Sequence, residues 1–149
     1  MTYVTIDFSL NSPGICIYAN NSYHFIGYLK PKTGTKKEQK MQEEIGMLNG
    51  VHISHQPDWT NNEGYSKSEM IKIQRHMQTA EDIINFIIDI AGDKGEFVIA
   101  FEGSSYGSSA GTNNIIDMAA GAAILKMKLY TKLNVLDILT VAPSTIKKH

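Results

Sequence analysis

The sequence has little of what marks an exported or membrane-bound chain. Its single cysteine, Cys16, excludes an internal disulfide. The longest apolar stretches, such as residues 83–91, are interrupted by polar residues and fall far short of a bilayer span. The N-terminus runs directly into a strand-like segment, without the basic start and long apolar run of a signal peptide. We therefore expect a soluble protein of the reducing cytoplasm that does not associate with a membrane.

The sequence also has no marked excess of positive over negative residues, or the reverse. Lys and Arg number 14 against 15 Asp and Glu, so the chain is not a polycation that coats nucleic acid, and an anionic partner needs a local patch. With 42% hydrophobic residues, 19% charged residues and only four prolines, a packed interior is expected rather than disorder. The 149 residues suit a single domain, over 1–149. Neither G-x-x-x-x-G-K-[ST] nor G-x-G-x-x-G occurs, so no nucleotide cofactor is expected.

What is present is a pattern typical of a mixed α/β fold. Alternating or continuous apolar runs predict strands, and longer segments with helical spacing predict helices. The expected elements are strands at 2–9, 15–18 and 23–29, a helix at 66–91 between Ser66 and Gly92, a strand at 96–102, a helix from 112 or 113 to 129, and a strand at 135–141. This order predicts a five-stranded mixed sheet flanked by helices, formed by a three-stranded antiparallel meander and two parallel strands.

Three further features belong to this architecture. Residues 30–66 break the pattern, and we interpret them as a long insertion outside the core with a short helix near 38–48. The second long helix carries small residues at 119–123 that permit close packing, and a last helix that begins near 143 is missing or incomplete. On the first long helix, an apolar stripe is expected to cover the sheet, formed by Met70, Ile73, Met77, Ala80, Ile84, Ile87 and Ile88.

Two acidic residues carry the chemical argument. Asp7 lies within an apolar strand, and Glu102 ends the strand 96–102. If the first and fourth strands are parallel neighbours, both carboxylates meet at one edge of the sheet. Such a pair favours a hard divalent cation, Mg²⁺ or Mn²⁺, that can activate water against a phosphodiester. Two-metal hydrolysis needs three or four carboxylates, so the chain supplies only part of the set.

These residues resemble a known family. Residues 7–15, DFSLNSPGI, are similar to the D-x-[GS]-x-x-x-x-G opening of the RNase H-like superfamily. Residues 97–121 and 141–147 resemble segments of RuvC-like Holliday junction resolvases, with phage-encoded members nearest. The resemblance implies two-metal cleavage of branched DNA, such as a four-way junction, by a homodimer, with Asp7 and Glu102 as the first two metal-binding acids. The family's remaining acids lie on a helix after the fifth strand, where this sequence stops.

Contacts to DNA are expected around the same edge. Tyr106, in the Gly/Ser-rich loop after Glu102, stands where the resolvases carry an aromatic that resembles a base-stacking wedge. Ser9 and Ser105 offer hydroxyl groups to phosphate. Lysines near this edge are candidates for phosphate contacts, whereas those of the insertion are interpreted as a solvated charge run. The former are Lys147 and Lys148.

Other interpretations stay open at this point. The missing late acids suggest a catalytically incomplete module of the same fold that binds nucleic acid or a protein partner. An actin-like ATPase fragment shares the type of first strand, but the chain is short for it and has no second Gly-rich phosphate motif. Asp117 and Asp137 are the nearby substitutes for the missing acids. Asp137 comes early in its strand, at the opposite edge from Glu102, and Asp117 is typical of a solvated helix residue.

Overall fold

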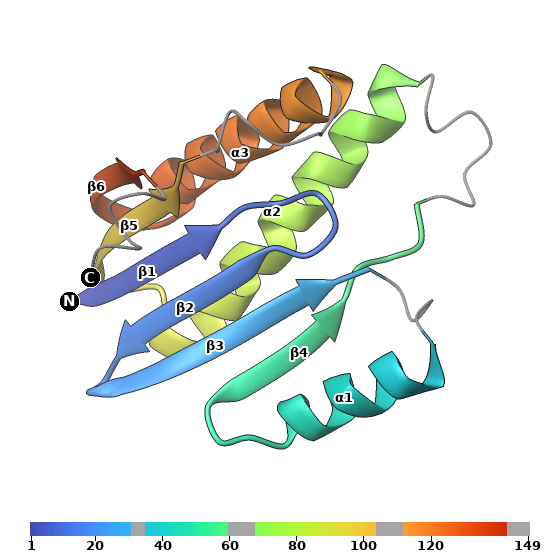
Figure 1. The fold of residues 1–149 in the computed structure, drawn as a ribbon. Coiled ribbons are helices and arrows are strands. Elements are labelled where there is room, and N and C mark those ends of the chain that lie inside the picture. Colours follow the sequence, from blue (N-terminus) through green and yellow to red (C-terminus); the bar gives the residue numbers. More distant parts are fainter. Residues whose placement is uncertain (31–34, 60–67, 104–111, 143–149) are drawn as a thin grey trace.

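The computed structural model describes residues 1–30, 35–59, 68–103 and 112–142. Within these ranges, six strands form one mixed sheet accompanied by three helices (Figure 1). In chain order the elements are β1 Thr2–Asp7, β2 Gly14–Ala19, β3 Ser22–Leu29, α1 Lys36–Gly46, β4 Val51–His55, α2 Glu69–Ala91, β5 Glu96–Glu102, α3 Thr112–Lys132 and β6 Asn134–Val141. Across the described part of the chain, every helix falls short of the length or apolar character that a membrane span requires.

The sheet has the topology that the sequence predicts for its centre. The strand order is β4-β3-β2-β1-β5-β6. β1, β2 and β3 form the antiparallel meander, and β5 lies parallel to β1, with Ile6 opposite Phe101 as the last pair of the ladder. β6 in turn lies parallel to β5. The two parallel strands therefore extend the meander on the side of β1.

The prediction of five strands is wrong by one. β4 lies inside the segment 30–66 that was interpreted as an excursion from the core, and it pairs in parallel with β3, with Phe25 opposite Val51. Four of the five β4 residues are half-buried. The sequence of β4, VHISH, alternates apolar and polar residues only over residues 51–54, the shortest length at which this pattern indicates a strand. The short helix predicted near 38–48 is α1. Thr35 begins it with a capping box, in which Glu38 N donates to Thr35 Oγ1 and Thr35 N donates to Glu38 Oε2.

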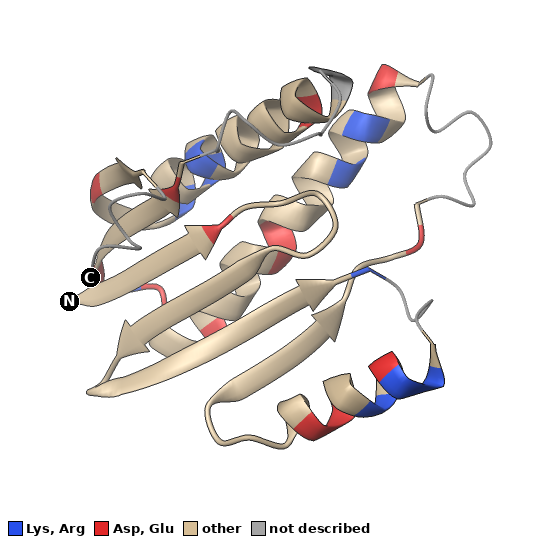
Figure 2. Cartoon of the chain, in the orientation of Figure 1, with Lys and Arg blue, Asp and Glu red and all other residues tan. Residues whose placement is uncertain are grey.

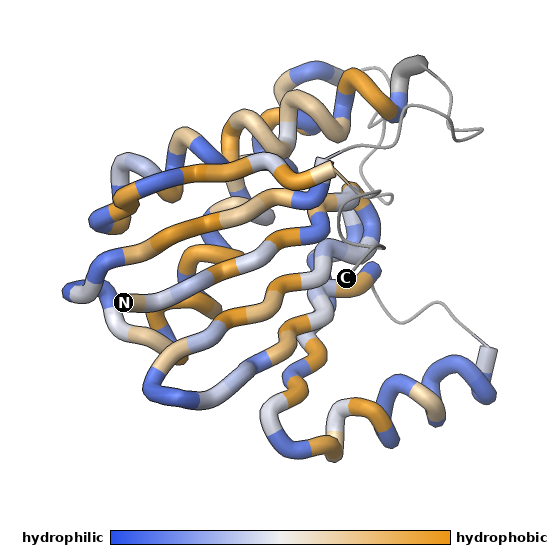
Figure 3. Tube along the Cα trace, turned by 60° about the vertical axis from the view of Figure 1, so that its left-hand side comes forward, coloured by the Kyte–Doolittle hydropathy of each residue, from blue (hydrophilic) through white to orange (hydrophobic). Residues whose placement is uncertain are grey.

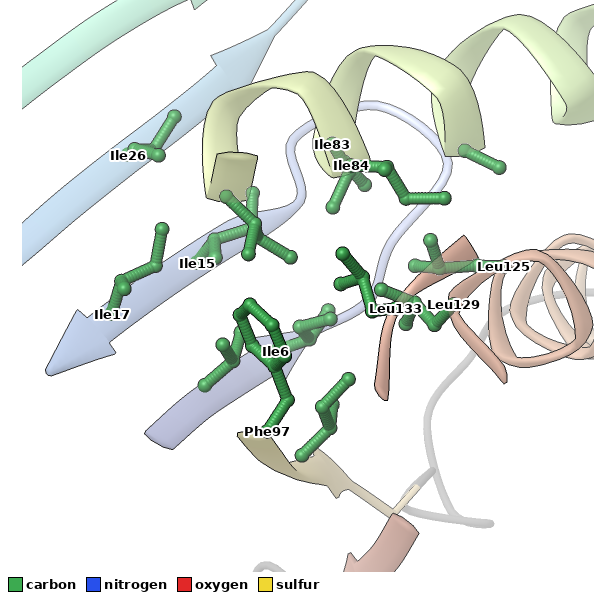
Figure 4. Packing of buried hydrophobic residues seen from close by; sticks show 14 of the residues in the cluster. Ile6, Ile15, Ile17, Ile26, Ile83, Ile84, Phe97, Leu125, Leu129 and Leu133 are labelled. Atoms are coloured by element: carbon green, nitrogen blue, oxygen red, sulfur yellow. The ribbon is translucent and has the colours of Figure 1, made fainter. Parts of the chain in front are cut away.

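The core lies between one face of the sheet and the helices α2 and α3 (Figure 4). Along β1, alternate residues point into this layer, so Val4 and Ile6 are buried while Thr5 is exposed. β5 follows the same alternation, with Phe97, Ile99 and Phe101 buried. The remaining buried hydrophobic residues are Ile15, Ile17, Ala19, Ile26, Tyr28, Ala80, Ile83, Ile84, Ile87, Leu125, Leu129 and Leu133.

The opposite face of the sheet is partly open, since Tyr3 and Phe25 on this face are 50% and 49% exposed. Figure 3 shows how apolar and polar residues follow one another along the strands. α1 lies on this side near β4 and leaves a groove of about 480 Å³ between itself and the sheet. The groove is lined by side chains of the open face, among them Thr5, Asp7, Cys16, Phe25 and Ile53. Asp7 thus belongs to an exposed surface rather than to the core.

The apolar stripe of α2 is only half covered. Ala80, Ile84 and Ile87 are buried as predicted, but Met70, Ile73 and Met77 are 69%, 49% and 46% exposed. A helix of 23 residues is roughly 35 Å long, whereas a six-residue strand spans about 20 Å. The N-terminal turns of α2 therefore extend past the end of the sheet (Figure 1), and we call residues 69–77 the overhang.

Both ends of α2 have identifiable caps. The side chain of Ser68 accepts a hydrogen bond from Ile71 N, so the helix starts two residues later than the predicted cap at Ser66. Gly92 ends the helix with φ of 76°, a left-handed value that glycine adopts without strain, and this end is as predicted.

Candidate metal centre and nucleic-acid interface

Five of the six strands end at the same edge of the sheet, which we call the carboxyl edge. β1, β3, β4, β5 and β6 share one direction, and β2 runs against them. Each of the three helices follows one of these strands and therefore begins at this edge (Figure 1). The N-termini of helices present unpaired N–H groups and a partial positive charge. The carboxyl edge is thus suited to an anionic ligand, as in other open α/β sheets.

Asp7 and Glu102 meet the geometric condition that the sequence argument set for them. Each is the last residue of its strand, and the strands β1 and β5 are parallel neighbours whose last pair is Ile6 and Phe101. Ile6 and Phe101 are buried toward the helices, so the alternation puts both acids on the opposite, open face. Neighbouring strands lie roughly 5 Å apart. The function of the two acids as metal ligands stays a prediction.

The donor chemistry of this pair fits Mg²⁺ or Mn²⁺. Both ions prefer hard oxygen ligands, and Mg²⁺ is commonly held by only one or two carboxylates together with water and substrate phosphate. Asp7 is exposed and Glu102 is half-buried, so both are open to an ion and its water. Over the ranges that the structure describes, no three His, Cys, Asp or Glu side chains gather closely enough to hold a metal ion.

The two substitute acids lie elsewhere. Asp117, on α3, forms an ion pair with Lys72 of α2, with 3.5 Å between Oδ2 and Nζ. Asp137 lies opposite Val98, four residues before Val141, which is the partner of Glu102. Four residues of strand correspond to roughly 13 Å. Neither acid joins the pair, which agrees with the interpretation drawn from the sequence.

The packing beneath Asp7 was not foreseen. His76 of α2 is buried, and a Cβ at Gly121 of α3 would lie 2.8 Å from His76 Nδ1 and 2.8 Å from Cζ of Phe8, which directly follows Asp7. Burial lowers the pKa of His76 from its ordinary value, although the nearby Asp117 carboxylate opposes the shift. The small residue predicted to permit close packing is thus Gly121, whereas its neighbours Ala119, Ala120 and Ala123 are exposed.

The predicted DNA contacts are described only in part. Ser9 lies in the loop after Asp7, where its hydroxyl oxygen accepts a hydrogen bond from Ser12 N at 3.1 Å. Ser105 and Tyr106, and likewise Lys147 and Lys148, lie outside the described residues. Figure 2 shows basic positions in the first half of α1, with an acidic one among them, and further acidic positions toward its end. The basic ones, all exposed, are Lys36, Lys37 and Lys40.

Comparisons with known proteins identify the fold. Neither a protein-family model nor a curated protein sequence matches the chain. Among solved structures, it is similar to T. thermophilus RuvC in complex with Holliday junction substrate, with a TM-score of 0.53 over 99% of this chain and 68% of that chain, at 9% identity. The yeast mitochondrial Holliday junction resolvase Ydc2 gives a TM-score of 0.47 over 98% of this chain and 52% of that one, at 10% identity. On the first of these likenesses, the chain has the RuvC-like form of the RNase H-like fold, as the sequence predicts.

Proposed function

We propose that this chain is a divalent-metal-dependent endonuclease that cleaves branched DNA, with the four-way junction as its substrate. The observation that carries the proposal is the arrangement of Asp7 and Glu102, which end adjacent parallel strands on one open face. The likeness of the fold to RuvC, whose structure contains a Holliday junction substrate, supports the choice of substrate. The fold alone hosts more than one activity, so the acid pair is the part of the argument that concerns chemistry.

In this proposal, Asp7 and Glu102 would hold Mg²⁺ or Mn²⁺ for two-metal phosphodiester hydrolysis. Such ions, when bound, would activate a water and stabilise the leaving oxygen of the phosphodiester. The chain supplies fixed geometry, because both acids are anchored at the ends of hydrogen-bonded strands and their separation is set by the sheet. The helix N-termini at the carboxyl edge favour the approach of a phosphate group.

Further parts of the proposal concern partners and location. Ser9, Ser105 and Tyr106, together with Lys147 and Lys148, are the proposed DNA contacts. We also propose a homodimer in the cytoplasm, of the kind the resemblance implies. The overhang of α2 is the surface that supports a dimer, because Ile73 and its apolar neighbours are exposed there without cover from the sheet.

Cleavage of a labelled four-way junction, compared with a linear duplex of the same sequence, tests this function. We expect cutting of the junction in Mg²⁺ or Mn²⁺ and none in a chelator. Asp7→Asn and Glu102→Gln should each abolish cutting. Asp137→Asn is the matched control, since Asp137 shares the open face but lies far from the acid pair. It should cut like the unchanged chain.

Metal binding has its own measurement. Mn²⁺ should raise the melting temperature of the unchanged chain and of Asp137→Asn, but not that of Asp7→Asn. Binding of the junction without cleavage in either metal would instead support the alternative, a catalytically incomplete module that binds nucleic acid.

A further inference from the structure

The loop that follows Asp7 is held from outside its own hairpin. Residues 8–13 connect β1 to β2, and in this loop the carbonyl oxygen of Leu10 accepts two side-chain hydrogen bonds. Arg75 Nη2 donates at 2.6 Å, and Gln56 Nε2 donates at 3.3 Å. Arg75 belongs to α2 and Gln56 directly follows β4. Two separate parts of the fold therefore meet at one carbonyl group beside the acid pair.

Gln56 is a buried residue with a fixed orientation. It is only 4% exposed, and its backbone N donates to Leu29 O at 2.7 Å. Besides its bond to the loop, Nε2 donates to Tyr28 O at 3.2 Å, and Oε1 accepts from Arg75 Nη2 at 3.4 Å. A buried amide whose donors and acceptor are all paired is costly to rotate, because rotation leaves buried polar atoms unpaired. Gln56 thus connects the end of β3, the loop and α2.

Arg75 is the sole arginine of the chain. Besides Leu10 O, its Nη2 lies 3.4 Å from Asn11 Oδ1, so it contacts two consecutive residues of the loop. These two contacts and the one to Gln56 Oε1 all come from one terminal nitrogen, Nη2, whose position is fixed by the planar guanidinium group. At this edge a cation is a natural candidate for a DNA phosphate, yet Arg75 Nη2 donates at 2.6 Å to the protein's own backbone.

We propose that Gln56 and Arg75 are positioning residues for the nuclease site. They hold the Leu10 carbonyl, and thereby fix the loop 8–13 and the direction in which the Asp7 carboxylate leaves the end of β1. This inference rests on the proposed function. It also gives the α1–β4 segment a use, because Gln56 brings the end of β4 to the catalytic loop. Neither residue touches the metal or the DNA in this arrangement.

Two substitutions weaken the hold on the Leu10 carbonyl. Gln56→Glu keeps the shape but loses Nε2 as a donor, and Arg75→Gln shortens the side chain and removes the guanidinium group with its charge. We expect the single-turnover cleavage rate to fall about 10- to 100-fold in each, because small misplacements of a reacting group have effects of that order. Arg75→Lys should recover little of the rate. Gln74→Glu, the same change at an exposed position of α2, is the control and should cleave like the unchanged chain.

The salt dependence of junction binding separates positioning from phosphate contact. A lost phosphate contact lowers the slope of log K against log salt by roughly 0.9. We expect Arg75→Gln to bind the junction with unchanged affinity and slope while its rate falls. A slope reduced by that amount, or variants that cleave as fast as the unchanged chain, would overturn the proposal.

Amide hydrogen exchange keeps this inference distinct from the proposed function. Exchange at residues 8–13 should become faster in both variants while the strands stay protected. If the unchanged chain cleaves no branched DNA in either metal, the proposed function fails, and unchanged exchange in the loop would then overturn the positioning as well. Faster exchange in the variants would show that Gln56 and Arg75 fix the loop, even if the chain is not a nuclease. Should Gln56→Glu fail to fold, Arg75→Gln, at a partly exposed position, gives the same readouts.

Discussion

Replacing Gly121 with alanine tests the packing directly beneath Asp7. The added Cβ would lie 2.8 Å from both His76 Nδ1 and the Cζ atom of Phe8. Non-bonded carbon atoms have their optimal separation at about 3.5–4.0 Å. Each ring must therefore move away by roughly 0.7–1.2 Å to relieve the overlap. Phe8 is the residue after Asp7, and its displacement pulls on the end of β1. The substitution should therefore lower both stability and cleavage rate.

Two opposing terms set the size of the effect on stability. Alanine is favoured over glycine within a helix by about 1 kcal/mol. Overpacking of a closely packed interior costs about 1–3 kcal/mol. We therefore expect a net loss of about 1 kcal/mol in the free energy of unfolding. Gly46→Ala, at the end of α1, is the matched control: its Cβ would meet Ile53 Cδ1 at 4.0 Å, an ordinary contact, so only the gain should remain.

Urea unfolding of both variants gives the comparison directly. Equal m-values in the two variants allow the midpoints to be read as differences in stability. Gly46→Ala should be as stable as the unchanged chain or more so, and Gly121→Ala less so. If Gly121→Ala matched Gly46→Ala in stability and the unchanged chain in cleavage rate, the close approach of α3 to Phe8 would be refuted.

Three other predictions concern His76, Tyr28 and the overhang. Because burial lowers the pKa of His76 below its ordinary 6.5, the unfolded chain binds the proton more readily. The free energy of unfolding should thus fall as the pH drops below about 6.5, and His76→Gln should flatten that slope in urea titrations. The hydroxyl group of Tyr28 donates to Asp82, so Tyr28→Phe should cost about 1–2 kcal/mol, and an unchanged urea midpoint would contradict the contact. On the overhang, Ile73→Glu should convert a dimer into a monomer in light scattering, whereas an unchanged mass would place the interface elsewhere.

The centre of the fold could be predicted because the local hydrophobicity pattern of its strands is recognisable in the sequence. β1 alternates strictly, as a strand with one buried and one exposed face does, and β5 is a nearly continuous apolar run whose second face is half-buried. With right-handed crossovers, the element order allows the two strands to be parallel neighbours, which the sheet confirms. β4 was missed because its apolar–polar alternation covers only residues 51–54, inside a segment whose glycines and lysines favour a loop. The exposed start of α2 was missed because periodicity reports one face of a helix but not where its partner layer ends.

Some residues of the candidate site likewise have a local signal in the sequence, and others have none. Asp7 and Glu102 are visible in the sequence because an acid inside or just after an apolar strand is unusual. Gln56 and Arg75 are not, since they lie 46 and 65 residues from Leu10 and act on a backbone carbonyl that has no sequence signature. The only hint in the sequence was that Arg75 is the single arginine of the chain. The contact of Gly121 with Phe8 likewise depends on the way α3 crosses α2, which sequence spacing does not specify.

The edge of the sheet opposite the acid pair is built entirely from tight connections. Asn20 and Asn21 turn β2 into β3 with left-handed φ values of 52° and 60°, and Gly92 leads through residues 93–95 into β5. These turns are a strand length, roughly 20 Å, from Asp7. A dye or surface tether attached at Asn21 or Lys94 would leave the carboxyl edge unobstructed. Such an attachment point suits a single-molecule test of the proposed binding and cleavage of a junction.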